Sequence, residues 1–420
     1  MTDLASAGAL SGEAGPDGRA GRAARTLRRL RAVAPALLGF AAVRLLCVMV
    51  LALWDPAEDK GVVRLLSGRW DSVWYASIAD EGYGRTVVAD DGGVHSDLAF
   101  FPLLPWLERL ISAVSPLSAG EAGLLVSAVA SLAAAWALFA IGERLYGRRA
   151  GVLLAVLWAA VPVGIVQSMA YTEALFTALA AWSLYAVLTG RWLTAGLLSA
   201  ATGLCRPAGL AVAAAVAAAA LAVLLAERAE RRAAEPAAER TAERTAGGAA
   251  GPWPWAAHRR MLAGVLLAPL GWAGYVLWVG ARTGEPLGYL RVQGDWGNGF
   301  DGGWAFARFI GDRLAGGNPV AGLGLCAGVA LLLWVCVRCV RMGLPLPLLV
   351  YGGVMVVLAL CAAGYFGSKP RLLLPAFPLL LPAAVALAGA RARVVAVVLV
   401  TAATGAALYG AVWLTGSGPP

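Results

Sequence analysis

Charged residues are scarce in this sequence: only 14% of its 420 residues are Asp, Glu, Lys or Arg, whereas 60% are hydrophobic. A soluble domain needs more polar residues than this to cover its surface, so the composition excludes a set of ordinary soluble domains. Several separate apolar runs are about 20 residues long, the length of helix that crosses roughly 30 Å of hydrocarbon. The sequence therefore predicts an all-α fold, a polytopic bundle of transmembrane helices.

Histidine and suitably spaced cysteines are also scarce. The only histidines are His95 and His258, and none of the six cysteines has metal-ligand spacing with them. Cys336 and Cys339 form a Cys-x-x-Cys sequence at the end of a predicted span, where packing explains them better than metal binding. These shortages argue against a zinc site or a disulfide scaffold. No cofactor is predicted, and a divalent metal stays open because loose carboxylates exist without an assembled ligand set.

The apolar runs predict about eleven spans. A break at Cys205-Arg206-Pro207 divides one long run into two shortened helices, because proline removes a backbone donor and disfavours helix before it. The net charge of +9 does not indicate nucleic-acid binding, since basic residues in membrane proteins mark cytoplasmic loops; their distribution places the N-terminus inside and the C-terminus outside. The predicted spans are 33–54, 122–141, 150–168, 171–189, the two helices within 192–226, 261–280, 319–340, 345–366, 372–389 and 394–415.

The connecting segments complete the predicted organisation. Residues 1–32 are rich in Gly, Ala and Arg and read as a disordered basic cytoplasmic tail; a cleaved signal peptide is the alternative, but the following apolar run is too long for one. The membrane domain covers 33–415, and 416–420 form a tail. Within that domain we expect a first outer loop with short interfacial helices, a charged cytoplasmic loop with partial helix, and a second outer loop. Their ranges are 55–120, 227–258 and 281–318.

The unusual polar residues fall on the outer side of this topology. An ionisable residue at a membrane boundary is costly enough to suggest a functional role, and several separate loops or breaks supply such residues to the same side. We therefore expect the active site to face away from the cytoplasm. The candidate residues are Asp71, Asp80, Glu81, Glu173, Arg206, Gln293, Trp296, Lys369 and Arg371, together with Trp70 and Trp74.

Asp71 is the candidate catalytic residue. It lies between Trp70 and Trp74, so its carboxylate is partly desolvated and suits a general base. The alternative is a helix N-cap, a position that aspartate favours. Asp80 and Glu81 are candidate substrate-binding residues, with a solvated turn as the alternative.

Four further charged residues have two interpretations each. Glu173 begins an apolar helix, where its charge can interact with the helix dipole as well as with a substrate. Arg206, beside the helix break, can face a lipid phosphate or pair with a carboxylate such as Glu173. Lys369 and Arg371 lie on the side where the positive-inside rule does not place them, so they predict an anionic ligand, with interfacial snorkelling as the alternative.

Tryptophan is abundant, with 16 in the chain. Most should anchor the helices at the membrane interface. Trp70, Trp74 and Trp296 lie in polar loops, where their rings can also stack on sugar faces, and Gln293 lies near the last of them.

Four motifs taken together resemble the PIG-V family, the second mannosyltransferases of GPI-anchor assembly and their bacterial relatives. The likeness runs in order from about residue 33 to Pro378. The Arg-Pro-Ala-Gly stretch departs from the Arg-x-Asn-Gly form of the family. The motifs are Arg69-Trp70-Asp71-Ser72-Val73-Trp74-Tyr75 with Gly82-Tyr83, Phe100-Phe101-Pro102-Leu103-Leu104-Pro105, Tyr171-Thr172-Glu173-Ala174-Leu175-Phe176, and Arg206-Pro207-Ala208-Gly209.

This resemblance implies a GT-C-like membrane glycosyltransferase that takes mannose from a polyprenyl- or dolichyl-phosphate with inversion. Asp71 matches the essential acidic residue of the first outer loop, and Arg206, Lys369 and Arg371 would hold the departing lipid phosphate. The Ala-, Arg- and Gly-rich composition indicates a high-GC bacterium, where a lipoglycan, a cell-wall polymer or a secreted protein would replace the GPI acceptor. The expected partners are thus a polyprenyl-phosphate sugar donor, a lipid, polymer or protein acceptor, and the cell membrane.

Two other classes of function remain as alternatives. A transporter or lipid-linked sugar flippase would need polar residues along a path through both halves of the bilayer, with some inverted symmetry. A non-catalytic scaffold for envelope assembly would keep the fold without the chemistry. Clustering of the polar residues on one side favours catalysis at a membrane boundary.

Overall fold

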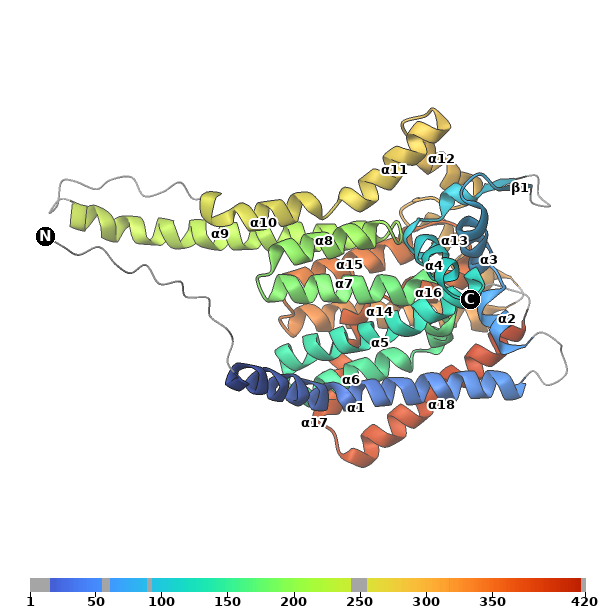
Figure 1. Ribbon diagram of the computed structural model, residues 1–420, viewed down its shortest axis with the longest axis horizontal. Coiled ribbons are helices and arrows are strands. Elements are labelled where there is room, and N and C mark those ends of the chain that lie inside the picture. Colours follow the sequence, from blue (N-terminus) through green and yellow to red (C-terminus); the bar gives the residue numbers. More distant parts are fainter. Residues whose placement is uncertain (1–15, 55–60, 89–92, 243–254, 317, 417–420) are drawn as a thin grey trace, which may run out of the picture.

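The computed structural model describes residues 16–54, 61–88, 93–242, 255–316 and 318–416, and these form an all-α bundle with one small hairpin. The helices that build the bundle run roughly side by side along its long axis (Figure 1). They are α1 (Pro16–Trp54), α5 (Ala119–Tyr146), α6 (Arg148–Ala159), α7 (Thr172–Leu188), α8 (Trp192–Gly203), α9 (Gly209–Ala242), α10 (Trp255–Leu267), α11 (Leu270–Thr283), α14 (Pro319–Arg341), α15 (Leu346–Cys361), α17 (Leu381–Gly389) and α18 (Ala392–Thr415).

Shorter elements gather at one end of the bundle, at the right of Figure 1, which we call the hairpin end. Strands β1 and β2 pair antiparallel there, with Val87 opposite His95. The elements are α2 (Val62–Ser67), α3 (Asp71–Glu81), β1 (Thr86–Val88), β2 (Val94–Ser96), η1 (Asp97–Ala99), α4 (Leu103–Val114), α12 (Gly288–Asp295), α13 (Trp304–Ala315), η3 (Phe366–Ser368) and α16 (Lys369–Leu372). The described parts of both predicted outer loops, 55–120 and 281–318, therefore meet at this end.

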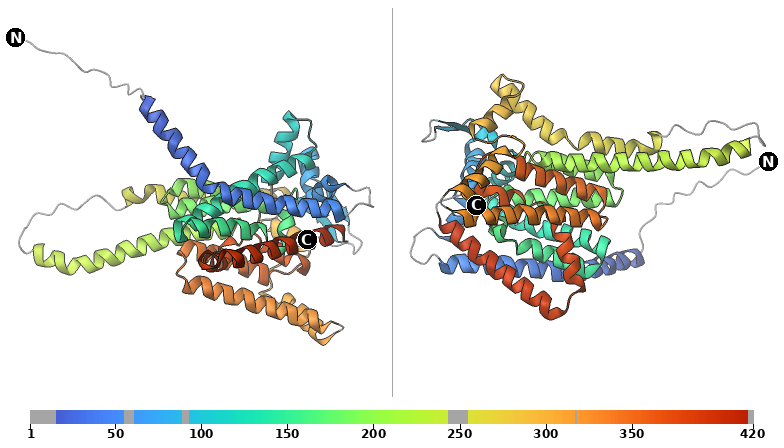
Figure 2. Two further views of the ribbon diagram at one scale, coloured as in Figure 1. Left: turned by 90° about the horizontal axis from the view of Figure 1, so that it is seen from below. Right: turned by 180° about the vertical axis from the view of Figure 1, so that it is seen from behind.

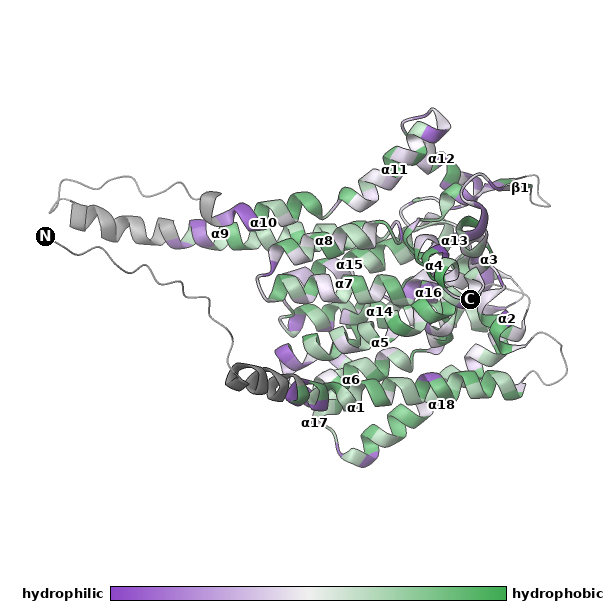
Figure 3. Ribbon diagram, viewed as in Figure 1, coloured by the Kyte–Doolittle hydropathy of each residue, from purple (hydrophilic) through white to green (hydrophobic). Residues whose placement is uncertain are grey.

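The bundle has the composition expected of a multi-pass membrane protein. Apolar residues cover most of its length, and hydrophilic ones lie mainly at its two ends (Figure 3). The helices long and apolar enough to cross a membrane are Leu27–Trp54, Ala119–Tyr146, Gly209–Glu230, His258–Thr283, Pro319–Arg341 and Ala392–Thr415. Two bent pairs and two shorter apolar helices coincide with four more predicted spans, and α8 occupies the first part of 192–226. Helices thus occupy the predicted spans, while the number eleven stays a prediction.

Three segments differ from the predicted organisation. Residues 16–32 belong to α1 instead of a disordered tail, because alanine and arginine have high helix propensity and extend the helix of the adjoining span. The hairpin of β1 and β2 was not predicted, since its strands are only three residues long. The predicted break at Arg206 is present between α8 and α9, although α9 is long instead of shortened and carries the partial helix expected in 227–258. Residues 1–15 and 417–420 lie outside the described residues.

Two bent helix pairs carry residues toward the hairpin end. Helix α6 meets η2 (Pro162–Ser168) at 85°, and the segment of η3 and α16 meets that of η4 (Phe377–Leu380) and α17 at 75°. A break frees backbone carbonyls, which are tolerated in a membrane protein only where other groups satisfy them. Side chains do so here: buried Arg44 of α1 donates to the carbonyls of Ala159 and Gly164.

The two breaks are also joined to each other. Gln167 donates to the carbonyl of Trp158 at 2.7 Å, and the Trp158 indole donates to the carbonyl of Leu374 at 3.0 Å. Because buried hydrogen bonds fix geometry and are costly to break, the segment before Tyr171 and the segment after Arg371 are held in one arrangement.

Candidate active site

Four charged side chains from four segments form a chain of alternating sign, which we call the charge chain. Asp71 Oδ2 lies 2.8 Å from Arg371 Nη1, and Arg371 Nε lies 3.4 Å from Glu173 Oε1. The same Glu173 oxygen pairs with Arg206 Nη1. The four residues come from α3, α16, α7 and the turn between α8 and α9. The chain balances two carboxylates against two guanidinium groups, as buried charges require.

Asp71 is the most exposed member, with 28% of its side chain accessible. It is the first residue of α3, where the helix dipole favours a carboxylate. The capping interpretation is wrong in detail, because Trp70 occupies the N-cap position and no side chain caps this helix. The Asp71 backbone N–H donates to the Tyr171 hydroxyl at 3.3 Å, which connects α3 with the start of α7.

Glu173 lies at the centre of the charge chain and is only 1% exposed. The predicted pairing of Arg206 with Glu173 is present, and the helix break at Pro207 lets the guanidinium reach it. The second oxygen, Oε2, is buried and accepts no hydrogen bond from the described residues. A buried acceptor without a partner is rare in proteins, so this oxygen is a candidate contact for a bound molecule.

Arg371 joins the two carboxylates. Its guanidinium carbon also lies 5.2 Å above the Tyr171 ring, a cation–π arrangement that favours a planar arginine over a lysine. Tyr171 therefore contacts both Arg371 and the backbone of Asp71. The sequence contained it in the Tyr-Thr-Glu motif, but its proximity to two charged groups depended on folding.

Lys369 makes its hydrogen bonds and ring contacts outside the charge chain, with backbone carbonyls and two aromatic rings. Its ammonium donates to the carbonyls of Ala359 and Ala362 at 2.7 and 2.8 Å, near the C-terminal end of α15. It also lies 4.6 Å from the Phe306 ring centroid and 5.3 Å from that of Phe366. In this arrangement Lys369 connects α16 with α13 and α15 and supports the segment that carries Arg371.

Gln293, Trp296 and Trp74 connect the two predicted outer loops. Gln293 donates to the carbonyl of Ala99 at 3.0 Å, and the Trp296 indole donates to that of Ser96 at 3.0 Å. Trp74 meets the Trp296 ring edge-on, with the centroids 5.1 Å apart. These contacts hold α12 against η1 and β2, so the structure uses the polar groups and rings for packing between loops.

Further aromatic contacts occupy the ring faces. Trp74 stacks on Phe100 at 5.6 Å and faces Arg85 at 5.4 Å, while His95 stacks on Trp296 at 4.3 Å. Trp70 lies under the Arg69 guanidinium at 4.3 Å. The sugar-stacking role of these indoles stays a prediction.

Asp80 and Glu81 are exposed at the far end of α3 from Asp71 and do not join the charge chain. The charge of Asp80 instead acts on Glu108 of α4, a residue to which sequence analysis assigned no role. Glu108 is fully buried, and neither of its oxygens bonds to any described residue. A Cβ on Gly123 of α5 would overlap its Oε1, so the glycine makes room for this carboxyl. The sequence signal that could have identified Glu108 is a glutamate among the apolar residues of α4.

Burial, with a smaller contribution from Asp80, raises the pKa of Glu108 from 4.5 to about 9. The folded protein therefore holds a proton there that the unfolded chain releases near pH 4.5, and stability falls as pH rises between these values. We expect a slope of at most about 1.4 kcal/mol per pH unit. Thermal unfolding at pH 5, 7 and 9 measures it: the stability of Glu108→Gln should fall less than that of wild type. Parallel curves of stability against pH for wild type and Glu108→Gln would contradict the expectation. Exposed Glu81→Gln is the control and should follow the wild-type curve.

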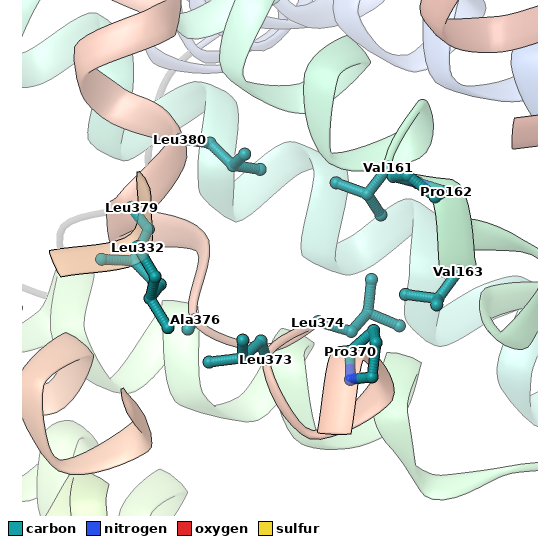
Figure 4. Close-up of a pocket in the computed structure, with 10 residues that line it drawn as sticks. All are labelled: Val161, Pro162, Val163, Leu332, Pro370, Leu373, Leu374, Ala376, Leu379 and Leu380. Carbon is teal, nitrogen blue, oxygen red and sulfur yellow. The ribbon is translucent and has the colours of Figure 1, made fainter. Parts of the chain in front are cut away.

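An apolar cavity of about 240 Å³ lies beside the segment that carries Arg371 (Figure 4). Pro370, which precedes Arg371, lines it, and Leu332 contributes from α14, the least buried of the six long apolar helices. The remaining lining residues come from the two breaks: Val161, Pro162, Val163, Leu373, Leu374, Ala376, Leu379 and Leu380. The cavity suits a hydrocarbon chain more than a polar group.

Metal ligands are not assembled within the described part of the chain, where no three His, Cys, Asp or Glu side chains form a group able to hold an ion. The charge chain supplies two cationic guanidinium groups, those of Arg206 and Arg371. It can bind an anion and present a partly exposed carboxylate beside it.

The family model described as dolichyl-phosphate-mannose-protein mannosyltransferase matches residues 97–239 of the 420. No curated protein matches the sequence. Among solved structures, ArnT from Cupriavidus metallidurans bound to undecaprenyl phosphate is similar with a TM-score of 0.49 and 16% identity, over 84% of this chain and 60% of ArnT. The apo state of the same protein gives 0.48 and 16%, over 85% and 60%. The chain thus spans less than two thirds of the length of these ArnT chains.

Proposed function

We propose that the protein is a membrane glycosyltransferase that moves a mannosyl residue from a polyprenyl-phosphate donor to an acceptor hydroxyl, with inversion at the anomeric carbon. The charge chain is the observation that carries this proposal. It places a partly exposed carboxylate, Asp71, against a guanidinium, Arg371, that is tied through Glu173 to a second guanidinium, Arg206. A base next to an anion-binding pair is what sugar transfer from a phosphate requires.

In the proposed reaction the acceptor oxygen forms a bond to the anomeric carbon while its proton passes to Asp71. The bond between that carbon and the phosphate oxygen breaks, and its electron pair stays on the departing polyprenyl phosphate. Negative charge grows on the phosphate during this step, and Arg371 and Arg206 stabilise it. Before this step, when the donor binds, Arg371 exchanges its contact with Asp71 for one with the phosphate, which frees the carboxylate to accept the proton.

The cavity beside Pro370 supports a lipid-linked donor. Its lining is apolar and includes Leu332 of α14, the least buried of the long apolar helices. Pro370, the residue before Arg371, also lines it. We place the first isoprenoid units of the donor in this cavity, with the phosphate at Arg371. Burial of a flexible hydrocarbon there gains about 25 cal/mol per Å² of apolar surface.

Mannose as the transferred sugar is supported by the match of residues 97–239 to a mannosyltransferase model and by the motif resemblance to the PIG-V family. The matched range includes Glu173 and Arg206. The acceptor proposed is a lipoglycan, a cell-wall polymer or a secreted protein on the extracytoplasmic face. A flippase is less well supported, because Asp71 and Arg371 belong to α3 and α16, elements that lie at the hairpin end instead of along the bundle (Figure 1).

Membranes containing the wild-type chain, supplied with radiolabelled polyprenyl-phosphate mannose, test this proposal. We expect label in a lipid, polymer or protein fraction at a rate well above that of membranes without the protein. The same donor carrying glucose is the control for the sugar. Label that crosses between leaflets without covalent transfer would instead identify a flippase, and transfer of glucose alone would overturn mannose.

A further inference from the structure

Trp70 has a strained backbone directly before the proposed base. Its φ of 52° and ψ of −124° lie where glycine is common and a side chain is crowded. It is the only non-glycine residue with positive φ in the part of the chain that the structure describes. Such a conformation persists only where its surroundings hold it, and it is frequent at functional sites.

The Arg69 side chain supplies one of these restraints. Its guanidinium donates to the carbonyl of Leu414 and, at 2.9 Å, to that of Gly416. The same group lies 4.3 Å above the Trp70 ring. The last carbonyls of a helix lack partners within it, and α18 ends at Thr415. A planar guanidinium can bond to two such carbonyls and stack on an indole at once, which an ammonium cannot do.

The backbone around Trp70 is fixed as well. Buried Ser72 accepts a hydrogen bond from the Arg69 N–H at 3.1 Å and donates one to the Arg69 carbonyl at 2.6 Å. On the other side of Trp70, the Asp71 N–H is bound by Tyr171. The peptide on each side of the strained residue is therefore held, and the direction of the Asp71 side chain is set by these restraints.

Helix α18 links the restrained backbone at Trp70 to the segment that leads into Tyr171 and Glu173. Its C-terminal end lies at the hairpin end, and the helix runs beside α1 (Figure 2). It also packs on η2, where Gly410 leaves room for the side chain of Ile165. Because η2 leads into Tyr171 and Glu173, α18 contacts both segments that frame the charge chain.

We propose that Arg69 is a positioning residue: it ties the C-terminal end of α18 to Trp70 and thereby aims the Asp71 carboxylate at Arg371 and the acceptor hydroxyl. This inference rests on the proposed function, in which Asp71 is the base. In this role the Arg69 guanidinium stays on α18 and Trp70 and does not touch the substrates. Its loss should therefore slow the chemical step and leave donor binding unchanged.

The experiment compares Arg69→Lys and Arg69→Ala with wild type in purified full-length protein, using the mannosyl-transfer assay with saturating acceptor. Displacement of a reacting group by about 1 Å can cost roughly 100-fold in rate. We expect kcat to fall about 10- to 100-fold in both variants, with KM for the donor within about twofold of wild type. Guanidinium ions added to Arg69→Ala should restore part of kcat, because they can refill the site between α18 and Trp70.

The controls separate positioning from folding and from the proposed function. Arg64, exposed on α2, gives the matched variant Arg64→Ala, which should keep wild-type kcat and gain nothing from guanidinium. Wild-type kcat in Arg69→Lys, or a loss in Arg69→Ala fully explained by unfolded protein and not rescued, would overturn the inference while transfer by wild type stands. Absence of transfer by wild type would overturn the proposed function, and this inference with it.

Discussion

Replacement of Asp71 by asparagine is expected to slow sugar transfer by about 10²–10⁴-fold, the usual contribution of a positioned general base. Asparagine keeps the size of the side chain and leaves an amide group beside Arg371, which lies 2.8 Å from the carboxylate in the wild type. It cannot take the acceptor proton. Arg371 also loses its competing carboxylate, so KM for the donor should stay the same or fall. Single-turnover transfer with enzyme-bound donor measures the chemical step directly.

The matched control for Asp71 lies on the same helix. Asp80→Asn and Glu81→Gln remove equal charge from α3 at exposed positions away from the charge chain. Transfer by both should stay within about twofold of wild type, because exposed charges at a distance are screened. Retention of more than a tenth of the wild-type rate by Asp71→Asn, or an equal loss in the controls, would remove Asp71 from the role of base.

Much of the fold followed from the sequence because span length and chain breaks are local properties. Apolar runs of suitable length became helices, and Pro207 broke the run at Arg206 as the loss of a backbone donor predicts. The pairing of Arg206 with Glu173 was one of two open interpretations. This pairing could be predicted from the sequence because burial of two opposite charges as a pair costs less than burial of each one alone.

Other parts of the site depended on contacts between distant segments. Lys369 and Arg371 are two residues apart and both basic, yet one binds carbonyls of α15 and the other two carboxylates. Both residues belong to one short segment, so their different roles follow from the packing of α13 and the end of α15 against Lys369. The restraint of Trp70 likewise requires Gly416, far along the chain, which no local pattern relates to Asp71.

Loss of the Glu173 charge is expected to have the largest effect on stability. Its carboxylate is 1% exposed and lies between Arg206 and Arg371, so Glu173→Ala leaves two neighbouring guanidinium groups with Asp71, which pairs with Arg371, as the one remaining carboxylate of the charge chain. Removal of one partner from a buried ion pair costs about 3–5 kcal/mol. Thermal unfolding in detergent should show a clear fall in Tm, with Glu173→Gln intermediate because its amide oxygen still accepts a hydrogen bond.

The exposed pair of Glu285 and Arg291 provides the control, since both side chains are 52% accessible at an N–O distance of 2.8 Å. Glu285→Gln should cost under about 1 kcal/mol, as exposed pairs do. The decisive comparison is the double variant Glu173→Gln with Arg206→Gln, which restores the balance of one carboxylate, Asp71, against one guanidinium, Arg371. It should be more stable than Glu173→Gln alone, giving a coupling energy of about 0.5–3 kcal/mol in a double-mutant cycle. If the two substitutions simply add, the buried charges are not coupled, and the cost of Glu173→Ala must come from lost packing instead.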